Sequence, residues 1–168
     1  MAWVSRVHNE LAPQELETQA VTREQVDKSL VRCPDEKAAT AMTKAIEQAK
    51  AENDSVGGIV TCVCRNIPAG LGEPCFDKLE AMFAHAMLSI PATKGFEIGS
   101  GFGGLSLKGS QHNDVFEKNP KGSGLTTKTN NSGGIQGGIS NGLPIVFRVC
   151  FKPPATIGCS QETVDFDG

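Results

Sequence analysis

The stretch TTKTNNSGGIQGGISNGLPIVFRVCFKPPATI, residues 126–157, combines three kinds of sequence that decide how the chain folds around it. Its first half is polar and contains the pairs Gly133-Gly134 and Gly137-Gly138. The run LPIVFRVCFK (143–152) has the β-branched and aromatic residues of a strand. KPPATI then ends that strand, because proline lacks the amide that a sheet requires. So much backbone without side chains, beside lysine and threonine, indicates either tight turns or an anion lying against the backbone.

The composition is that of one domain that does not bind nucleic acid. At 168 residues the chain is long enough to bury a core. A net charge of −3 gives no basic surface for nucleic acid, and no apolar run reaches the length of a membrane span. The start, MAWVSRVHNE, lacks the basic and apolar regions of a signal peptide. We therefore expect a cytoplasmic protein without nucleic-acid or membrane partners.

The cysteines and histidines do not follow a disulfide or metal-binding pattern. No Cys-x-x-Cys pair occurs among the six cysteines, which are Cys33, Cys62, Cys64, Cys75, Cys150 and Cys159. Several of them lie inside apolar strand-like runs, which favours buried reduced thiols over disulfides. His8, His85 and His112 are far apart in sequence, so we expect no metal site.

Local patterns predict four strands and three helices. The strands are expected at 2–8, 55–68, 94–100 and 143–152, where β-branched and alternating apolar residues recur. The helices are expected at 22–30, 33–54 and 73–90. The last helix should end at Pro91 and place five apolar side chains on one face, namely Phe76, Leu79, Met82, Phe83 and Ala86. Strands and helices lack a steady βαβ rhythm, which favours an α+β fold.

The glycine-rich part of the chain contains a match to a nucleotide-binding motif. Residues 95–142 hold 13 of the 19 glycines, which is typical of a loop-rich binding surface. GSGFGG (99–104) fits the G-x-G-x-x-G dinucleotide fingerprint, but Gly109-Ser110 follows too soon for the required helix. We therefore expect a tight connection there. His112, in SQHND (110–114), suits either acid–base chemistry or an ordinary turn, and its neighbours favour the turn.

Two further segments leave a ligand open. The four glycines in residues 133–138 permit contact of a flat or phosphorylated ligand with backbone amides, or equally a turn or a close strand crossing. Lys152 and Thr156 place a cation and a hydroxyl around two stiffening prolines, which suits a phosphate monoester. The alternative for this second segment is a plain strand end at the surface.

Several long stretches carry a resemblance to one family. They are DSVGGIVTCVCRNIPAGLGEPCFDKLEAMFAHAMLSIPATKGFEIGSGFGG (54–104), GSQHND (109–114) and TTKTNNSGGIQGGISNGLPIVFRVCFKPPATIG (126–158), with AWVSRV (2–7) and VRCPDEKA (31–38) beside them. GLGEP before a helix, then SIPATKG, SGGIQGGISNG and KPPATI form a specific order. In this order and content the chain resembles chorismate synthase of the fungal and plant type.

The resemblance implies an enzyme of aromatic amino acid biosynthesis. Chorismate synthase converts 5-enolpyruvylshikimate 3-phosphate into chorismate and phosphate by a 1,4-elimination that needs reduced FMN. Fungal members also reduce their FMN with NADPH. The family subunit layers antiparallel sheets against helices and assembles as a homotetramer.

The resemblance also implies a flavin-binding region over residues 91–157. Its flavin contacts fall at Pro91, Ala92, Gly137, Lys152, Pro153, Pro154, Ala155 and Thr156. Bacterial members commonly have Asn in place of Pro91, a change that a backbone contact survives. The flavin ring would lie against bare backbone, while the turn from Lys152 to Thr156 would hold its phosphate and ribityl end.

The family motifs that supply the catalytic histidines have no counterpart in this sequence. We therefore assign no catalytic residue, and we expect residues 1–168 to form a partial domain from the middle-to-late part of a family chain. We expect this chain alone not to turn over the substrate. Two alternatives remain: a catalytically inactive FMN- or phosphate-binding remnant, and a fragment that exposes an apolar strand edge at 145–151.

Overall fold

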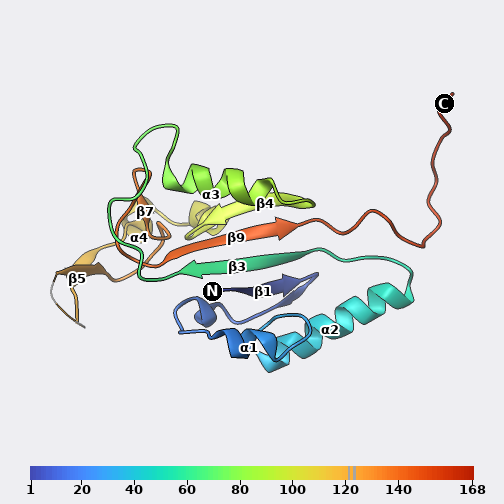
Figure 1. The fold of residues 1–168 in the computed structure, drawn as a ribbon, viewed down its shortest axis with the longest axis horizontal. Coiled ribbons are helices and arrows are strands. Elements are labelled where there is room, and N and C mark those ends of the chain that lie inside the picture. The colour runs from blue at the N-terminus through green and yellow to red at the C-terminus, as the bar shows by residue number, and fades with distance from the viewer. Residues whose placement is uncertain (121, 123) are drawn as a thin grey trace.

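The centre of the molecule is a five-stranded antiparallel sheet with the strand order β2-β1-β3-β9-β4. The structure is a computed structural model that describes residues 1–120, 122 and 124–168. In Figure 1, α1 and α2 lie beyond the β1 side of the sheet, and α3 runs beside β4. The predicted α+β class, with antiparallel sheets layered against helices, is confirmed.

The elements have the following bounds. The central sheet contains β1 (Ala2–Val7), β2 (Glu10–Leu11), β3 (Gly58–Cys64), β4 (Thr93–Ile98) and β9 (Ile145–Phe151). Two short pairs are β5 (Phe116–Lys118) with β6 (Leu125–Thr127), and β7 (Ile135–Gln136) with β8 (Ile139–Ser140). The helices are α1 (Arg23–Asp27), α2 (Glu36–Ala51), α3 (Leu79–Leu88) and α4 (Gly109–His112), with the 3-10 helices η1 (Gln14–Glu17) and η2 (Gly101–Ser106).

Strand β9 is the central element of the core. Phe147 and Val149 are buried on one side of it, and Phe147 meets the rings of Phe83 from α3 and Phe96 from β4 at centroid distances of 5.1 and 5.6 Å. On the other side, Val146 joins a second cluster around Trp3. This alternation follows the two-residue period of a strand that is covered on both faces.

Helix α2 begins and packs as its sequence predicts. The Asp35 carboxylate accepts a hydrogen bond of 2.7 Å from the Ala38 amide, which satisfies one of the unpaired donors at the start of the helix. Its apolar stripe, centred on the fully buried Met42, covers Val7 of β1 and Cys33. The strands predicted at 2–8, 55–68, 94–100 and 143–152 and the helices at 22–30 and 33–54 are thus present, most with shorter bounds.

The prediction for the third helix is wrong in its first turn and in its buried face. Residues 73–78 are not helical, and Phe76 is 91% exposed with a left-handed φ of 54°. The helix begins at Leu79, whose amide donates a hydrogen bond of 2.8 Å to the carbonyl of Gly138. Leu79 and Phe83 pack in the core, whereas Met82 and Ala86, predicted on the same face, are exposed.

The cysteines are unpaired thiols, but not all of them are buried as predicted. Cys75 and Cys150 are exposed, and Cys33 is almost completely buried. Cys150 points away from the α3 side of β9, opposite to Val149. Burial, followed by the proximity of Cys64, raises the pKa of Cys62 to about 11. This shift makes Cys62 a poor nucleophile near neutral pH.

The structure also contradicts the alternative of a fragment that exposes an apolar strand edge at residues 145–151. β9 pairs with β3 on one side and with β4 on the other, so the outer strands of the sheet are β2 and β4. Every helix within residues 1–120, 122 and 124–168 falls short of the length and hydrophobicity that a membrane span requires.

Candidate functional site

The end of β9 brings together two of the three predicted flavin-contact segments. The Lys152 amide donates a hydrogen bond of 2.9 Å to the carbonyl of Ala92, and Phe151 pairs with Thr93 across the same strands. Ala92 has a left-handed φ of 68°, which turns the chain between α3 and β4. Ala92 therefore lies beside Lys152, the first residue of the segment 152–156, which we call the β9-exit turn.

The β9-exit turn has unused hydrogen-bond donors. Its residues are all exposed, and the Lys152 ammonium makes only a long contact of 3.4 Å with the carbonyl of Pro153. Within the described part of the chain, the amides of Ala155 and Thr156 and the Thr156 hydroxyl have no hydrogen-bond partner. A cation, amides and a hydroxyl are the kinds of donor that bind the oxygens of a phosphate group.

Contacts with Ser55 and Gly57, just before β3, hold the start of the β9-exit turn in place. The Ser55 hydroxyl donates a hydrogen bond of 2.6 Å to the carbonyl of Pro154. Pro153 packs so closely on Gly57 that a Cβ there would lie 3.0 Å from the proline ring. The two prolines and these contacts fix the direction in which the turn leaves the sheet.

Gly137 lies at the other end of β9, away from the other predicted flavin contacts. It forms the β7–β8 turn with Gly138, and the carbonyl of Gly138 accepts the amide of Leu79 at the start of α3. Pro91 follows the end of the same helix, whose ten residues span about 15 Å. Within one chain, the structure therefore brings Ala92 and Lys152 together but separates Gly137 from them.

Most of the glycines in residues 133–138 lie where two backbone segments pass very close to each other. A Cβ on Gly133 would lie 2.4 Å from the amide nitrogen of Gly99, and one on Gly134 would lie 2.6 Å from the carbonyl oxygen of Pro144. Gly138 is equally close to the carbonyl of Glu73, at 2.4 Å. Only Gly137 among these four has open space around its Cβ position, so only this glycine leaves room for a ligand.

A polar cluster that sequence reasoning missed surrounds the turn after β4. The Ser100 hydroxyl lies 2.8 Å from Nε2 of His112, and the Asn131 side chain donates to the carbonyl of His112 at 2.9 Å. No local pattern reveals this cluster, because its members come from three separate segments. The match of GSGFGG to a dinucleotide fingerprint ends here in η2, a six-residue 3-10 helix, so the expected tight connection is confirmed.

Asp114 is the buried centre of this cluster. Its carboxylate accepts hydrogen bonds from the Thr129 hydroxyl at 2.7 Å and from the amides of Asn131 and Ser132 at 2.8 and 2.9 Å. Burial by itself would raise the pKa of Asp114, but these hydrogen bonds outweigh burial and lower that pKa below its ordinary value. The carboxylate therefore stays ionised and holds the glycine-rich loop against α4.

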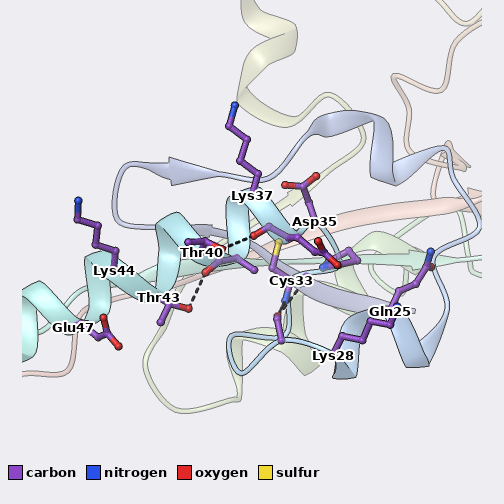
Figure 2. A pocket seen from close by; sticks show the side chains of 13 residues that line it. Gln25, Lys28, Cys33, Asp35, Lys37, Thr40, Thr43, Lys44 and Glu47 are labelled. Atoms are coloured by element: carbon purple, nitrogen blue, oxygen red, sulfur yellow. Dashed lines mark hydrogen bonds between the residues drawn. The ribbon is translucent and has the colours of Figure 1, made fainter.

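A large groove beside α2 lacks the features of a ligand site. It measures about 1140 Å³ and lies along the first turns of α2. Asp35 caps the helix, and the hydroxyls of Thr40 and Thr43 donate to backbone carbonyls one turn back. In Figure 2 the side chains of Lys37 and Lys44 extend from α2 in a direction away from Lys28. The polar groups of Asp35, Thr40 and Thr43 are therefore already used in hydrogen bonds within the helix.

The comparison with protein families decides which family this chain represents. The family model described as chorismate synthase matches residues 1–168, the whole chain. The chain belongs to the chorismate synthase family. The resemblance predicted from the sequence motifs is thereby confirmed.

Individual chorismate synthases match the chain at high identity. It is 52% identical over 168 residues to a chorismate synthase of Prochlorococcus marinus (strain AS9601), covering 100% of this chain and 46% of the relative. It is 62% identical over 149 residues to a chorismate synthase of Saccharomyces cerevisiae, covering 88% of this chain and 40% of that relative. A crystal structure of a chorismate synthase superposes with a TM-score of 0.81 at 31% identity, covering 90% of this chain and 48% of the other. The chain thus spans less than half the length of these chorismate synthases.

Proposed function

We propose that this chain is the part of a chorismate synthase that holds the phosphate end of reduced FMN. Two observations support the proposal: the family match over all 168 residues, and the unused donors of the β9-exit turn. The complete enzyme would convert 5-enolpyruvylshikimate 3-phosphate into chorismate and phosphate, in aromatic amino acid biosynthesis. It would do so in the cytoplasm and as a homotetramer, with NADPH as a source of electrons for the flavin in fungal-type members.

The residues of the β9-exit turn would each do a separate part of the binding. Lys152 would neutralise phosphate charge, while the amides of Ala155 and Thr156 and the Thr156 hydroxyl would donate hydrogen bonds to its oxygens. Pro153 and Pro154 would keep these donors in place, because their fixed φ angles reduce the entropy lost on binding. Pro91 and Ala92 would form the adjoining side of the flavin-binding site.

The chemistry of the elimination lies outside the residues of this chain. Reduced FMN, when bound, supplies electron density and a proton-accepting N5 atom to the reaction. Phosphate departure also needs a placed general acid, and the histidine motifs that serve the family in this way have no counterpart in this sequence. We therefore expect the chain alone to bind flavin without producing chorismate.

A titration with two flavins tests the proposal. FMN and riboflavin, which lacks the phosphate, are titrated into the purified chain and followed by flavin fluorescence. Lys152→Ala should weaken FMN binding about tenfold, the effect of losing one charge-assisted hydrogen bond, and should leave riboflavin binding unchanged. Lys44→Ala, an exposed lysine on α2, is the matched control and should change neither. Absence of saturable FMN binding, or an equal loss for both flavins, would contradict the assignment.

A further inference from the structure

Two cysteines of β3 bring their sulfur atoms close together on one face of the central sheet. Cys62 and Cys64 are two positions apart in the strand, so their side chains point to the same face. Their Sγ atoms lie 3.9 Å apart, and within the described part of the chain neither thiol has another hydrogen-bond partner. Both are free, half-buried thiols. The lack of Cys-x-x-Cys pairs led us to expect no metal site, but a site of two thiols needs only this closer spacing.

The two thiols can be reached from the β1 side of the sheet. On β9 their cross-strand neighbours are Phe147 and Ile145, which are buried. On β1 the residue opposite Cys62 is Ala2, which is small and exposed. Because cross-strand neighbours share a face, the pair lies at the border between the core and an open part of the sheet. A small ligand can approach the sulfur atoms there.

A disulfide is a poor fit for this pair. Residues two positions apart in a strand have Cα atoms about 6.7 Å apart, which is near the upper limit for a disulfide. Hydrogen bonds to β1 and β9 on the two sides of β3 oppose the bending that would bring the sulfur atoms closer. The raised pKa of Cys62 also keeps this thiol protonated near neutral pH, which slows its reaction with oxidants.

The separation of the sulfur atoms fits a bridging metal ion instead. An ion placed about 2.3 Å from each sulfur, the usual length of a zinc–thiolate bond, would have an S–metal–S angle of about 116°. This angle lies between the tetrahedral and the trigonal value. The backbone of β3 therefore needs no movement for both thiolates to bind one ion.

We propose that Cys62 and Cys64 form a binding site for a soft monovalent cation, Cu(I). Soft thiolate ligands select Cu(I) or zinc, but zinc is normally held by three or four protein ligands. Within residues 1–120, 122 and 124–168, no group of three or more His, Cys, Asp or Glu side chains could hold a metal ion. Cu(I) accepts two or three ligands, so one pair of thiolates suffices, and a ligand from solution can complete the coordination from the β1 side.

The binding step is an exchange of protons for copper. Two S–H bonds break, two Cu–S bonds form, and both protons go to the solvent. Copper stays in its +1 state and the sulfur atoms are not oxidised, so the step needs no oxidant or reductant. Ligands must lose their protons before they bind a metal, and here the metal supplies the driving force for that loss.

A competition titration under anaerobic conditions tests the site. The reduced chain is added to Cu(I) held by bathocuproine disulfonate, whose colour reports the copper that remains on the chelator. The chain should withdraw one equivalent of Cu(I). Cys62→Ala and Cys64→Ala should each lower the affinity at least about a hundredfold, because one remaining thiol cannot chelate, and the double variant should lower it little further. Cys75→Ala and Cys150→Ala, at exposed thiols, are the matched controls and should change nothing.

A second variant separates loss of the site from loss of the fold. Cys62→Val keeps an apolar side chain against the core cluster that Cys62 contacts. It should lose copper as Cys62→Ala does, while its thermal midpoint in the absence of copper stays within about 4 °C of the unsubstituted chain. X-ray absorption of the loaded, unsubstituted chain should show at least two sulfur ligands on copper.

Three results would overturn the proposal. One is copper uptake that is unchanged in both single variants. Another is a Zn(II) affinity that equals the Cu(I) affinity and depends on the same two cysteines. The third is a disulfide between residues 62 and 64, found by mass spectrometry after mild treatment of the folded chain with hydrogen peroxide, which would assign the pair to redox chemistry. All of these measurements omit flavin, so they stand apart from the test of the proposed function.

Discussion

At the scale of single residues, Asp114 connects three residues of the glycine-rich region to the end of α4. Its two carboxylate oxygens accept three hydrogen bonds from Thr129, Asn131 and Ser132, and the residue is only 3% exposed. The partners lie 15 to 18 positions later in sequence. The fold around a loop with few apolar side chains therefore depends on one ionised group.

The lowered pKa of Asp114 predicts a pH-dependent stability. A carboxyl whose pKa is lower when folded contributes stability above its unfolded pKa of about 4, and the contribution is lost as pH falls through the folded pKa. Asp114→Asn should therefore lower the free energy of unfolding in urea by roughly 2 kcal/mol at pH 7. Near pH 3 the same substitution should lower it by clearly less. Asp77→Asn, at an exposed aspartate, should show no such trend. A cost for Asp114→Asn that is equal at both pH values would refute this role.

At the scale of elements, the β7–β8 segment and β9 approach each other through glycine. Gly134 has a φ of 79°, and a Cβ on it would meet the carbonyl oxygen of Pro144 at 2.6 Å. Gly137 has a φ of 60° but open space around it. The two glycines look alike in the sequence, yet only Gly134 is required for packing.

The difference between these glycines predicts unequal costs of substitution. Gly137→Ala should destabilise the chain by about 1 to 2 kcal/mol, the cost of a left-handed backbone for an L-residue. Gly134→Ala should cost more than about 3 kcal/mol, because a clash with backbone adds to that strain. Chemical denaturation of the two variants measures both values. Equal losses of unfolding free energy would mean that the β7–β8 segment can move away from β9 without a cost in free energy.

At the scale of the whole molecule, an ion pair between Glu17 of η1 and Arg148 of β9 connects the N-terminal segment to the sheet. Arg148 of β9 donates to both carboxylate oxygens of Glu17 at 2.6 and 2.8 Å, and each side chain is 17% exposed. Arg148 also donates to the carbonyl of Gly99 at 2.7 Å. It thereby fixes η1 and the turn after β4 on the same face of β9.

A double-mutant cycle should detect this connection. Glu17→Gln alone should cost about 2 to 3 kcal/mol, because it leaves a largely buried guanidinium without its counter-charge. The double variant Glu17→Gln/Arg148→Met should cost less than the sum of the two single changes. The exposed pair Arg23–Asp27, with side chains 76% and 37% exposed, should show a coupling below about 0.5 kcal/mol. Coupling energies that do not differ between the pairs would exclude an organising role for Arg148.

The sequence by itself determined the elements with a regular pattern, the α+β class and the family. β1, β3, β4 and β9 were predictable from alternation and β-branched residues, and α2 from its cap at Asp35 and its apolar period, because these are local properties of the backbone. The exposed Lys152 and Thr156 could be named from the sequence as candidate phosphate donors, and their role in flavin binding stays a prediction.

Only the tertiary structure decided how these pieces meet. It placed β9 between β3 and β4, joined Ala92 to Lys152, and put Gly137 at the opposite end of α3. It also began α3 at Leu79, whose amide bonds to Gly138 about sixty residues away, and it left Phe76 exposed. Pairings of this kind depend on contacts between segments far apart in the chain. No local propensity encodes such contacts, because their free energy appears only when the whole core is formed.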